Sequence, residues 1–201
     1  MKIKAVLFDF DGTVIDTMKE YAEVAVEIIS KEIGIEKKEA KRVYLSTAGR
    51  DFLSQLRLMG IEGERALKIY SEFLEEKKKI LNSKEISHHA VELMKELKRK
   101  GMIVAVSTNN ECELVFSIPG INNFDEVLCF DKKQFKKGTA HLSALMLKYH
   151  LKKEEILFIG DSDYDIETYS QLGIKCLKTK GIFNEREADR ILEEIESERL
   201  E

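Results

Sequence analysis

Residues 3–13 read Ile-Lys-Ala-Val-Leu-Phe-Asp-Phe-Asp-Gly-Thr, and they give the strongest indication of the fold class. Its apolar part, Ile3 to Phe8, is nearly continuous instead of alternating with polar residues. Such a run is typical of a strand in a parallel sheet, because helices cover both faces of that kind of sheet. Two acidic residues, Asp9 and Asp11, follow at once, so the sequence predicts a buried strand that ends in carboxylates.

The rest of the chain repeats this unit. Further short apolar runs lie at Met102–Val106, Glu126–Phe130, Ile156–Ile159 and Ile174–Leu177. Helical patterns lie between or after these runs, at Ser87–Lys100, Thr139–Tyr149, Asp165–Leu172 and Glu185–Ile195. Ser87 is expected to cap its helix, and Gly101 and Gly173 are expected to end theirs. The alternation predicts an α/β fold, with a Rossmann-like doubly wound parallel sheet.

One interval breaks the repeat. Residues 17–81 are helical in pattern throughout, with Thr17 and Glu20 as a capping box at the start and Gly34 ending the first helix. This interval is far longer than the dozen or so residues that a crossover connection needs, although an elaborate crossover lying on the sheet is the alternative. We therefore expect a core domain of residues 1–16 and 83–201, and a small all-helical cap domain of residues 17–82. An insertion at this place is a candidate lid.

Composition excludes several classes of protein. The chain has 201 residues, 43% of them hydrophobic, a mean hydropathy of −0.28 and a net charge of −4. That suits one sizeable core with a small module, and it argues against nucleic-acid binding through a basic surface. The apolar runs are too short to span a membrane, and no signal peptide is expected.

Cys112, Cys129 and Cys176 form no CxxC pair, so we expect reduced thiols and a cytoplasmic protein. One Pro, no Trp and abundant Lys and Glu suit a heat-adapted source.

The first acidic pair is suited to metal and phosphate chemistry. In an extended segment, a spacing of two places the carboxylates of Asp9 and Asp11 on one side, where their like charges repel. A cation relieves that repulsion, and Mg²⁺ binds through one or two carboxylates with phosphate and water. Gly12 then permits a tight turn and a close approach of the backbone to a ligand. Taken alone, the pattern also fits an ordinary polar strand end.

Two other predicted strands end in polar groups. Residues 160–165 read Gly-Asp-Ser-Asp-Tyr-Asp, and residues 104–109 read Val-Ala-Val-Ser-Thr-Asn. Ligands of open α/β sheets collect outside the carboxyl ends of the strands, so these groups are expected to converge with Asp9 and Asp11 if their strands are adjacent.

Together these residues resemble the haloacid dehalogenase superfamily of phosphohydrolases. Residues 9–13 match its first motif, residues 104–109 its second, and residues 160–165 its fourth, in the GDxxxD form. The helical insertion lies where phosphoglycolate phosphatases and β-phosphoglucomutase carry a cap. The third motif departs from the family pattern, in which a Lys is often followed by Pro. Here residues 135–139 read Phe-Lys-Lys-Gly-Thr, from which we choose Lys137, with Lys136 as the alternate.

The resemblance implies a role for each residue. Asp9 would attack phosphorus to form an aspartyl-phosphate, and Asp11 would serve as general acid and base. Mg²⁺ would be held by Asp9, the main-chain carbonyl of Asp11 and Asp161, with Asp165 supporting the metal shell. The expected phosphate-binding residues are Thr108, Asn109 and Lys137, and a possible contact to the rest of the substrate is Arg50. Asp163 has no counterpart and is interpreted as an exposed loop acid.

The expected function is therefore that of a Mg²⁺-dependent phosphatase acting on a small phosphorylated metabolite through an aspartyl-phosphate. Asp11 argues against a dehalogenase, because displacement of halide needs no acid for the leaving group. A phosphomutase of the β-phosphoglucomutase type is the alternative enzyme. A non-catalytic regulatory protein that binds a phosphate ligand is the alternative from another class. The expected partner is a small phosphate ester, and neither nucleic acid nor membrane is expected.

Overall fold

The computed structural model describes residues 3–47, 50–131 and 135–200, with side chains described up to residue 197. The chain divides into two compact units. One comprises Met1–Asp16 and Lys84–Glu201 and is called the sheet unit below; the other, Thr17–Ser83, is called the helical unit.

The sheet unit contains five parallel strands in the order β3-β2-β1-β4-β5. Their bounds are β1 Ala5–Asp9, β2 Ile103–Glu111, β3 Glu126–Phe130, β4 Ile156–Gly160 and β5 Lys175–Lys178. All five expected strands are confirmed, and β3 has the predicted bounds. The largest difference is in β2, which continues five residues past its expected end at Val106.

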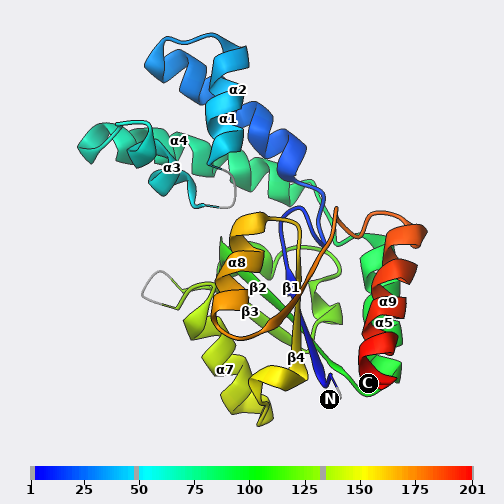
Figure 1. Ribbon diagram of the computed structural model, residues 1–201. Coiled ribbons are helices and arrows are strands. Elements are labelled where there is room, and N and C mark those ends of the chain that lie inside the picture. The colour runs from blue at the N-terminus through cyan, green and yellow to red at the C-terminus, as the bar shows by residue number, and fades with distance from the viewer. Residues whose placement is uncertain (1–2, 48–49, 132–134, 201) are drawn as a thin grey trace. The chain divides into compact units, whose positions relative to one another are not determined.

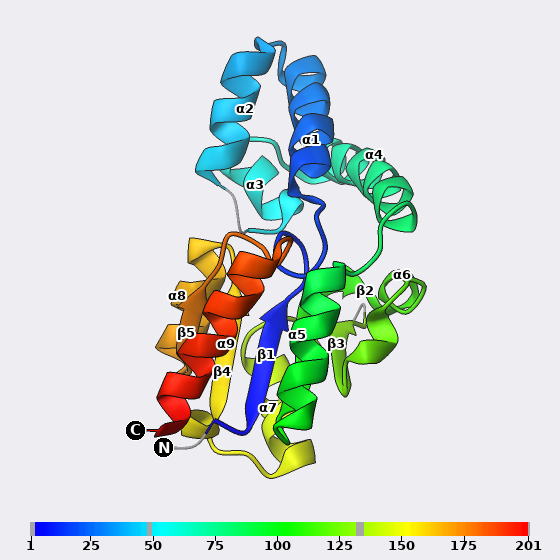
Figure 2. The ribbon, with the colours of Figure 1, turned by 90° about the vertical axis from the view of Figure 1, so that its right-hand side faces the viewer.

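Helices cover both faces of this sheet (Figures 1 and 2). Helices α5 (His88–Arg99) and α9 (Glu185–Leu200) lie on one face, and α7 (Thr139–Tyr149) and α8 (Asp163–Gln171) lie on the other. Three short elements complete the unit: α6 (Cys112–Val115) and the 3₁₀ turns η1 (Ile121–Asn123) and η2 (Lys153–Glu155). The doubly wound α/β fold is thus confirmed, because every strand pair is parallel and the helices are divided between the two faces.

Strand β1 is the centre of the core. All five of its residues are buried, and those from Ala5 to Phe8 have no exposed area. Toward α7 and α8, the β1 side chains of Ala5 and Leu7 join a cluster of buried residues, among them Leu145, Phe158 and Tyr169. Burying a large apolar side chain stabilises a fold by about 1.5–3 kcal/mol, which is why nearly continuous apolar runs specify central strands.

The helical unit contains α1 (Met18–Ile33), α2 (Lys37–Ser46), α3 (Phe52–Leu58) and α4 (Gly63–Asn82). Its interior is held by aromatic contacts. Phe73 of α4 contacts Phe52 with ring centroids 4.1 Å apart and Tyr21 with centroids 6.3 Å apart, and Tyr44 packs edge-on against Phe52. One side-chain ring from each helix thus contributes to a common core.

Helix ends agree with the sequence in part. Gly34, Gly101 and Gly173 all have positive φ angles where their helices end, as expected. The capping box at Thr17 and Glu20 was wrong: Thr17 precedes α1, but its side chain makes no capping bond. Its backbone, with φ −123° and ψ −18°, lacks the extended conformation that brings a cap oxygen to the first turn. Ser87 likewise precedes α5 without a capping bond from its side chain.

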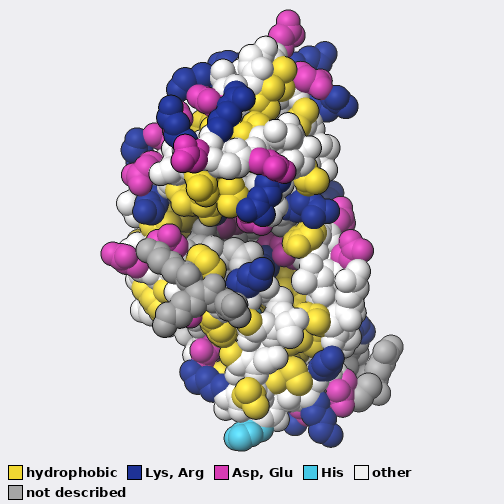
Figure 3. All heavy atoms as spheres, turned by 90° about the vertical axis from the view of Figure 1, so that its left-hand side faces the viewer, with side chains coloured by type: hydrophobic (Ala, Val, Ile, Leu, Met, Phe, Trp, Pro, Cys, Tyr) yellow, Lys and Arg dark blue, Asp and Glu magenta, His cyan; other side chains and the backbone are white. Residues whose placement is uncertain are grey.

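Over the described residues, no helix is both long and apolar enough to cross a membrane. On the face that Figure 3 shows, acidic and basic side chains are interspersed. This distribution matches the small net charge of −4.

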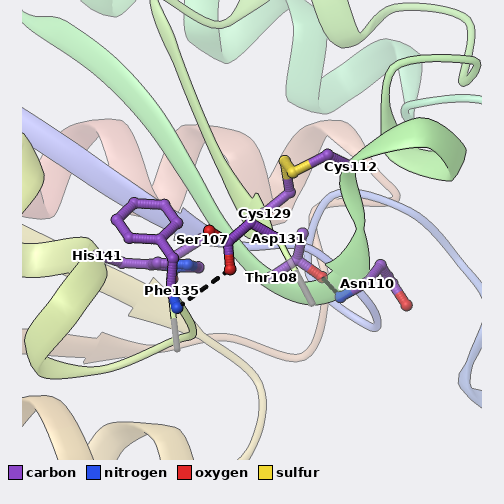
Figure 4. The surroundings of a disulfide bond; sticks show 8 residues. All are labelled: Ser107, Thr108, Asn110, Cys112, Cys129, Asp131, Phe135 and His141. Atoms are coloured by element: carbon purple, nitrogen blue, oxygen red, sulfur yellow. Dashed lines mark hydrogen bonds between the residues drawn. A yellow bond between two sulfur atoms is a disulfide. The ribbon is translucent and has the colours of Figure 1, made fainter. Parts of the chain in front are cut away.

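A disulfide corrects the expectation of three reduced thiols. Cys112, at the start of α6, is bonded to Cys129 in β3, and only Cys176 is free (Figure 4). The two partners are 17 residues apart in the chain. They meet because β2 extends to Glu111, which pairs in parallel with Phe130 of β3. The sequence spacing gave no sign of this, since the expected β2 ended six residues before Cys112.

A buried polar chain crosses the layer between the sheet and helices α7 and α8. His141 Nδ1 on α7 is 2.8 Å from Ser107 Oγ on β2, and Ser107 Oγ is 2.8 Å from Tyr169 Oη on α8. None of the three residues has exposed area. Burial, and then the charge of Lys137, lower the pKa of His141 from 6.5 to about 4, so the ring is neutral at physiological pH.

We expect the disulfide to stabilise the sheet unit. Replacing Cys112 by Ser, or reducing the bond, should lower the free energy of unfolding by about 3 kcal/mol, the value expected for a closed loop of this length. Denaturant unfolding of oxidised and reduced protein measures this. The matched control is Cys176→Ser, which removes a free thiol and should change little; equal stability of the oxidised and reduced forms would contradict the prediction.

We expect His141 to make stability pH-dependent in mild acid. Below pH 6.5 the unfolded chain binds a proton at this residue, whereas the folded chain stays neutral down to about pH 4. Stability should therefore fall as pH decreases through this window, by on the order of 3 kcal/mol at its lower end. In His141→Gln the unfolding free energy should depend less steeply on pH, because about one proton fewer is taken up on unfolding. An unchanged slope in that variant would show that His141 titrates normally.

Candidate active site

Three strand ends meet at one edge of the sheet. β1 lies between β2 and β4, so Asp9 stands beside Ser107, the last residue of β2 that pairs with β1, and near Gly160 at the end of β4. A side chain at Gly160 would have its Cβ 2.8 Å from the Phe158 ring and 3.4 Å from Asp9 Cβ. A side chain there would therefore clash with the Phe158 ring, whereas its approach to Asp9 would be an ordinary van der Waals contact.

Asp9 is buried against a lysine. Only 5% of Asp9 is exposed. Its Oδ1 accepts hydrogen bonds from the Phe10 main-chain N–H at 2.6 Å and from Lys137 Nζ at 2.6 Å. Lys137 Nζ also lies 2.8 Å from Asp165 Oδ2. One ammonium group therefore bridges two buried carboxylates that are 156 residues apart in the chain.

Negative charge exceeds positive charge at this place. Burial raises the pKa of Asp9 well above its usual range; Lys137 opposes the shift, and the charges of Asp165 and Asp161 add to it. Burial also raises the pKa of Asp161. For Lys137, burial lowers the pKa, but the charges of Asp9 and Asp165 outweigh it and hold the pKa above its usual range. Burial is thus the main cause of the raised carboxyl pKa values, and the crowding of carboxylates around Lys137 adds to it for Asp9 and raises the pKa of the lysine itself.

Asp11 is held by a residue that sequence reasoning missed. Asn110 Nδ2 donates to Asp11 Oδ2 at 2.8 Å. The second-motif pattern was taken to end at Asn109. Because side chains alternate along an extended strand, Asn110 shares a side with Thr108 and not with its neighbour Asn109. Continuing this alternation one residue past Asn109 would have identified Asn110 as a candidate site residue.

Two hydroxyl groups orient the other carboxylates. Thr13 Oγ1 donates to Asp161 Oδ1 at 3.2 Å, and Ser162 Oγ donates to Asp165 Oδ2 at 2.7 Å. Ser162 also accepts from the Asp165 main-chain N–H, which starts α8 two residues earlier than expected. Asp163 is exposed as expected, but it lies in the first turn of this helix and pairs with Lys178, so its placement in a loop was wrong.

The remaining expected phosphate-binding residues also reach this edge. Thr108 is buried, and its Oγ1 accepts from the Asn110 main-chain N–H at 3.1 Å. Asn109 Oδ1 accepts from the Lys137 main-chain N–H at 3.0 Å, which ties the lysine segment to the end of β2. Of the two candidate lysines, Lys137 contacts the carboxylates, whereas Lys136 is exposed.

Arg50 belongs to the helical unit and is exposed. Its main-chain carbonyl accepts from Gln55 Nε2 at 2.9 Å, and Gln55 Oε1 accepts from Thr47 Oγ1 at 2.9 Å. Buried Gln55 therefore fixes both ends of the loop that contains Arg50. The middle of this loop, residues 48 and 49, lies outside the described residues.

The donor set fits a divalent cation of the magnesium type. Within the described part of the chain, no group of three or more His, Cys, Asp or Glu is spaced to hold a metal ion by itself. Mg²⁺ needs only one or two carboxylates, with the other positions taken by water and phosphate. Burial and neighbouring carboxylates both raise the pKa values of Asp9 and Asp161, and a bound cation would favour their ionised forms.

Comparison with known proteins agrees with this geometry. The family model described as haloacid dehalogenase-like hydrolase matches residues 6–179. A protein of Caldanaerobacter subterraneus subsp. tengcongensis, which carries the provisional name pyrophosphatase PpaX, is 31% identical over 188 residues, covering 90% of this chain and 83% of the relative.

Two solved structures share the fold. A haloacid dehalogenase-like hydrolase from Bacteroides fragilis superposes with a TM-score of 0.73 at 20% identity, covering 94% of this chain and 93% of that one. A protein from Haemophilus somnus 129pt, described as a predicted phosphoglycolate phosphatase, has a TM-score of 0.66 at 22% identity, covering 89% and 85%. Because the family model spans residues 6–179 and a relative is 31% identical over 90% of this chain, the chain belongs to the haloacid dehalogenase-like hydrolase family.

Proposed function

We propose that this protein is a Mg²⁺-dependent phosphatase that hydrolyses a small phosphorylated metabolite through an aspartyl-phosphate. The observation that carries the proposal is the buried contact of Asp9 with Lys137, next to an Asp11 that Asn110 holds in place. A nucleophile, a cation for phosphoryl oxygens and an acid–base group thus belong to one sheet edge.

The chemistry assigned to these residues balances in two steps. An Asp9 carboxylate oxygen forms a bond to phosphorus while the bond from phosphorus to the ester oxygen breaks, and Asp11 gives its proton to that oxygen. Asp11 then takes a proton from water, whose oxygen attacks phosphorus and releases inorganic phosphate and Asp9. Thr108, Asn109 and Lys137 bind the other phosphoryl oxygens during both steps.

Magnesium belongs to the same proposal. Asp9, the main-chain carbonyl of Asp11 and Asp161 would hold the ion, and Asp165 would support that set. When bound, Mg²⁺ neutralises charge on the phosphoryl group.

We assign the helical unit, Thr17–Ser83, the role of a cap that limits substrates to small molecules. It is inserted directly after the turn that follows Asp11, and its aromatic core makes it a compact body of its own. A cap that closes excludes bulk water from the reacting group and can bring a residue such as Arg50 to the substrate.

Inorganic pyrophosphate is a second candidate substrate. The relative with 31% identity carries a pyrophosphatase name. The same two steps would serve, with phosphate as the leaving group in place of an alcohol.

We place the reaction in the cytoplasm. The disulfide fits that compartment in a heat-adapted organism, since intracellular proteins of hyperthermophiles are rich in disulfides. Trapping the thiols of Cys112 and Cys129 in intact cells, and locating the protein by fractionation, tests the assignment; recovery outside the cytoplasm would contradict it.

We expect the wild-type protein with Mg²⁺ to release phosphate from at least one small phosphomonoester or from pyrophosphate. Asp9→Asn should lower kcat/KM by roughly 10³-fold or more, because an amide is nearly isosteric but cannot act as the nucleophile. A phosphate-release screen with both proteins measures this, and circular dichroism confirms that the variant is folded.

The same screen separates the alternatives. Wild-type rates in a pure Asp9→Asn preparation would remove Asp9 from the mechanism. Conversion between phosphate isomers without release of phosphate would favour a mutase, and inactivity on the whole panel would favour a phosphate-binding regulatory protein. Equal kcat/KM for small esters and a folded phosphoprotein would contradict the capping role of the helical unit.

We expect turnover to stop in excess chelator and to return with added Mg²⁺. Ca²⁺ should restore less activity, because it prefers more oxygen ligands at longer distances than Mg²⁺. Steady-state rates in metal-free buffer with each ion added back test this. Full activity in excess chelator would exclude the metal assignment.

A further inference from the structure

The residue after Lys137 has a backbone conformation that the family pattern would not allow. Gly138 has φ +102° and ψ −134°, in a region that residues with a side chain rarely adopt. Proline, which often follows the motif lysine in the family, is fixed near φ −65° and cannot take this path. The segment that carries Lys137 must therefore be held by something other than a proline ring.

A tyrosine contacts this segment directly. The Gly138 main-chain N–H, a group that proline lacks, donates to Tyr169 Oη at 3.3 Å. Tyr169 has no exposed area, and its ring stacks on Phe158 with centroids 4.0 Å apart. Its hydroxyl is thus presented to Gly138 from a fixed ring on α8.

The hydroxyl is fixed in turn by the buried polar chain. Tyr169 Oη is bonded to Ser107 Oγ, which is bonded to His141 Nδ1. The Gly138 N–H donates to Tyr169 Oη, which leaves the Tyr169 hydroxyl hydrogen to donate to Ser107 Oγ. The Ser107 hydroxyl then donates to Nδ1 of the neutral His141 ring, so that each hydroxyl group donates one hydrogen bond. The ring of His141 also packs against Phe135, two residues before Lys137, with centroids 4.5 Å apart (Figure 4 shows His141, Ser107 and Phe135).

We propose that Tyr169, oriented by Ser107 and His141, is a positioning residue for Lys137 and replaces the constraint of a proline at position 138. It acts beside Asn109, which accepts from the main-chain N–H of Lys137 itself. The role of Lys137 in holding phosphoryl oxygens rests on the function proposed above. Lys137 Nζ must meet Asp9 and Asp165 within hydrogen-bonding distance, and a main-chain shift of about 1 Å is enough to disturb such a geometry.

The test is the variant Tyr169→Phe, which keeps the ring and its stacking on Phe158 but removes the hydroxyl. We expect the KM for the best phosphate ester and the inhibition constant of inorganic phosphate to rise roughly 10-fold, the effect of one lost hydrogen bond, while kcat changes less. Tyr149→Phe is the matched control: its hydroxyl bonds to Asp125 and Glu126, away from Lys137, so both constants should be unchanged.

A double-mutant cycle distinguishes positioning from general destabilisation. In a Lys137→Met background, Tyr169→Phe should have little further effect on either constant, because the group it positions is gone. Ser107→Ala, which leaves the ring and hydroxyl of Tyr169 in place, should show the same pattern to a smaller extent. It serves as the primary variant if Tyr169→Phe does not fold.

Amide hydrogen exchange tests the anchor without any turnover. The Gly138 amide should exchange slowly in the wild type and at least 10-fold faster in Tyr169→Phe, with Tyr149→Phe unchanged. Inactivity of the wild type on every substrate would overturn the proposed phosphatase function. The exchange rate of the Gly138 amide would still show whether the Tyr169 hydroxyl anchors this segment. The positioning role is overturned by unchanged Gly138 exchange, by unchanged phosphate constants, or by effects that add fully to those of Lys137→Met.

Discussion

A single buried ammonium group between two buried carboxylates is the interaction on which the site depends. Lys137 bridges Asp9 and Asp165, and all three side chains are at most 10% exposed. Charges removed from water are costly unless each has a partner, and removing one partner typically costs about 3–5 kcal/mol. With Asp161 nearby, one ammonium faces three carboxylates, so the pairing is incomplete. That incompleteness is suited to binding a cation and works against stability, as is typical of functional sites.

The fold brings these charges together through strand order. Asp9 ends the central strand β1. Thr108 lies in the neighbouring strand β2, and Asp161 directly follows the other neighbouring strand, β4, so both residues come from segments far from Asp9 in the chain. Each carboxylate then accepts a hydrogen bond from a neutral donor that fixes its direction. Asp9 accepts from the Phe10 main-chain N–H, and Asp11 accepts from Asn110. Asp161 accepts from Thr13, and Asp165 accepts from Ser162. These donors add no charge, so they orient the carboxylates without cancelling the excess negative charge.

The extension of β2 links the site to the structural cross-link. It carries Thr108 and then Asn110, which holds Asp11, and it leads directly to Cys112 at the start of α6, which is bonded to β3. The pairing of β2 with β3 shifts register between Ser107 and Glu111, so the regular ladder does not hold this segment. The disulfide therefore anchors a part of the chain that lacks regular strand pairing and carries Asn110, the partner of Asp11.

The parallel sheet can be inferred from the sequence alone, because nearly continuous apolar strands are typical of sheets that helices cover on both faces. The sequence also places Asp9, Asp11 and Asp161 at or just after the carboxyl ends of strands, since local order along the chain fixes which end of a strand a residue occupies. Four contacts become visible only in the folded chain: Lys137 with Asp9, Asn110 with Asp11, Tyr169 with Gly138, and Cys112 with Cys129. Those pairs join residues distant in sequence, and their contacts depend on strand register and helix placement, which no local pattern encodes.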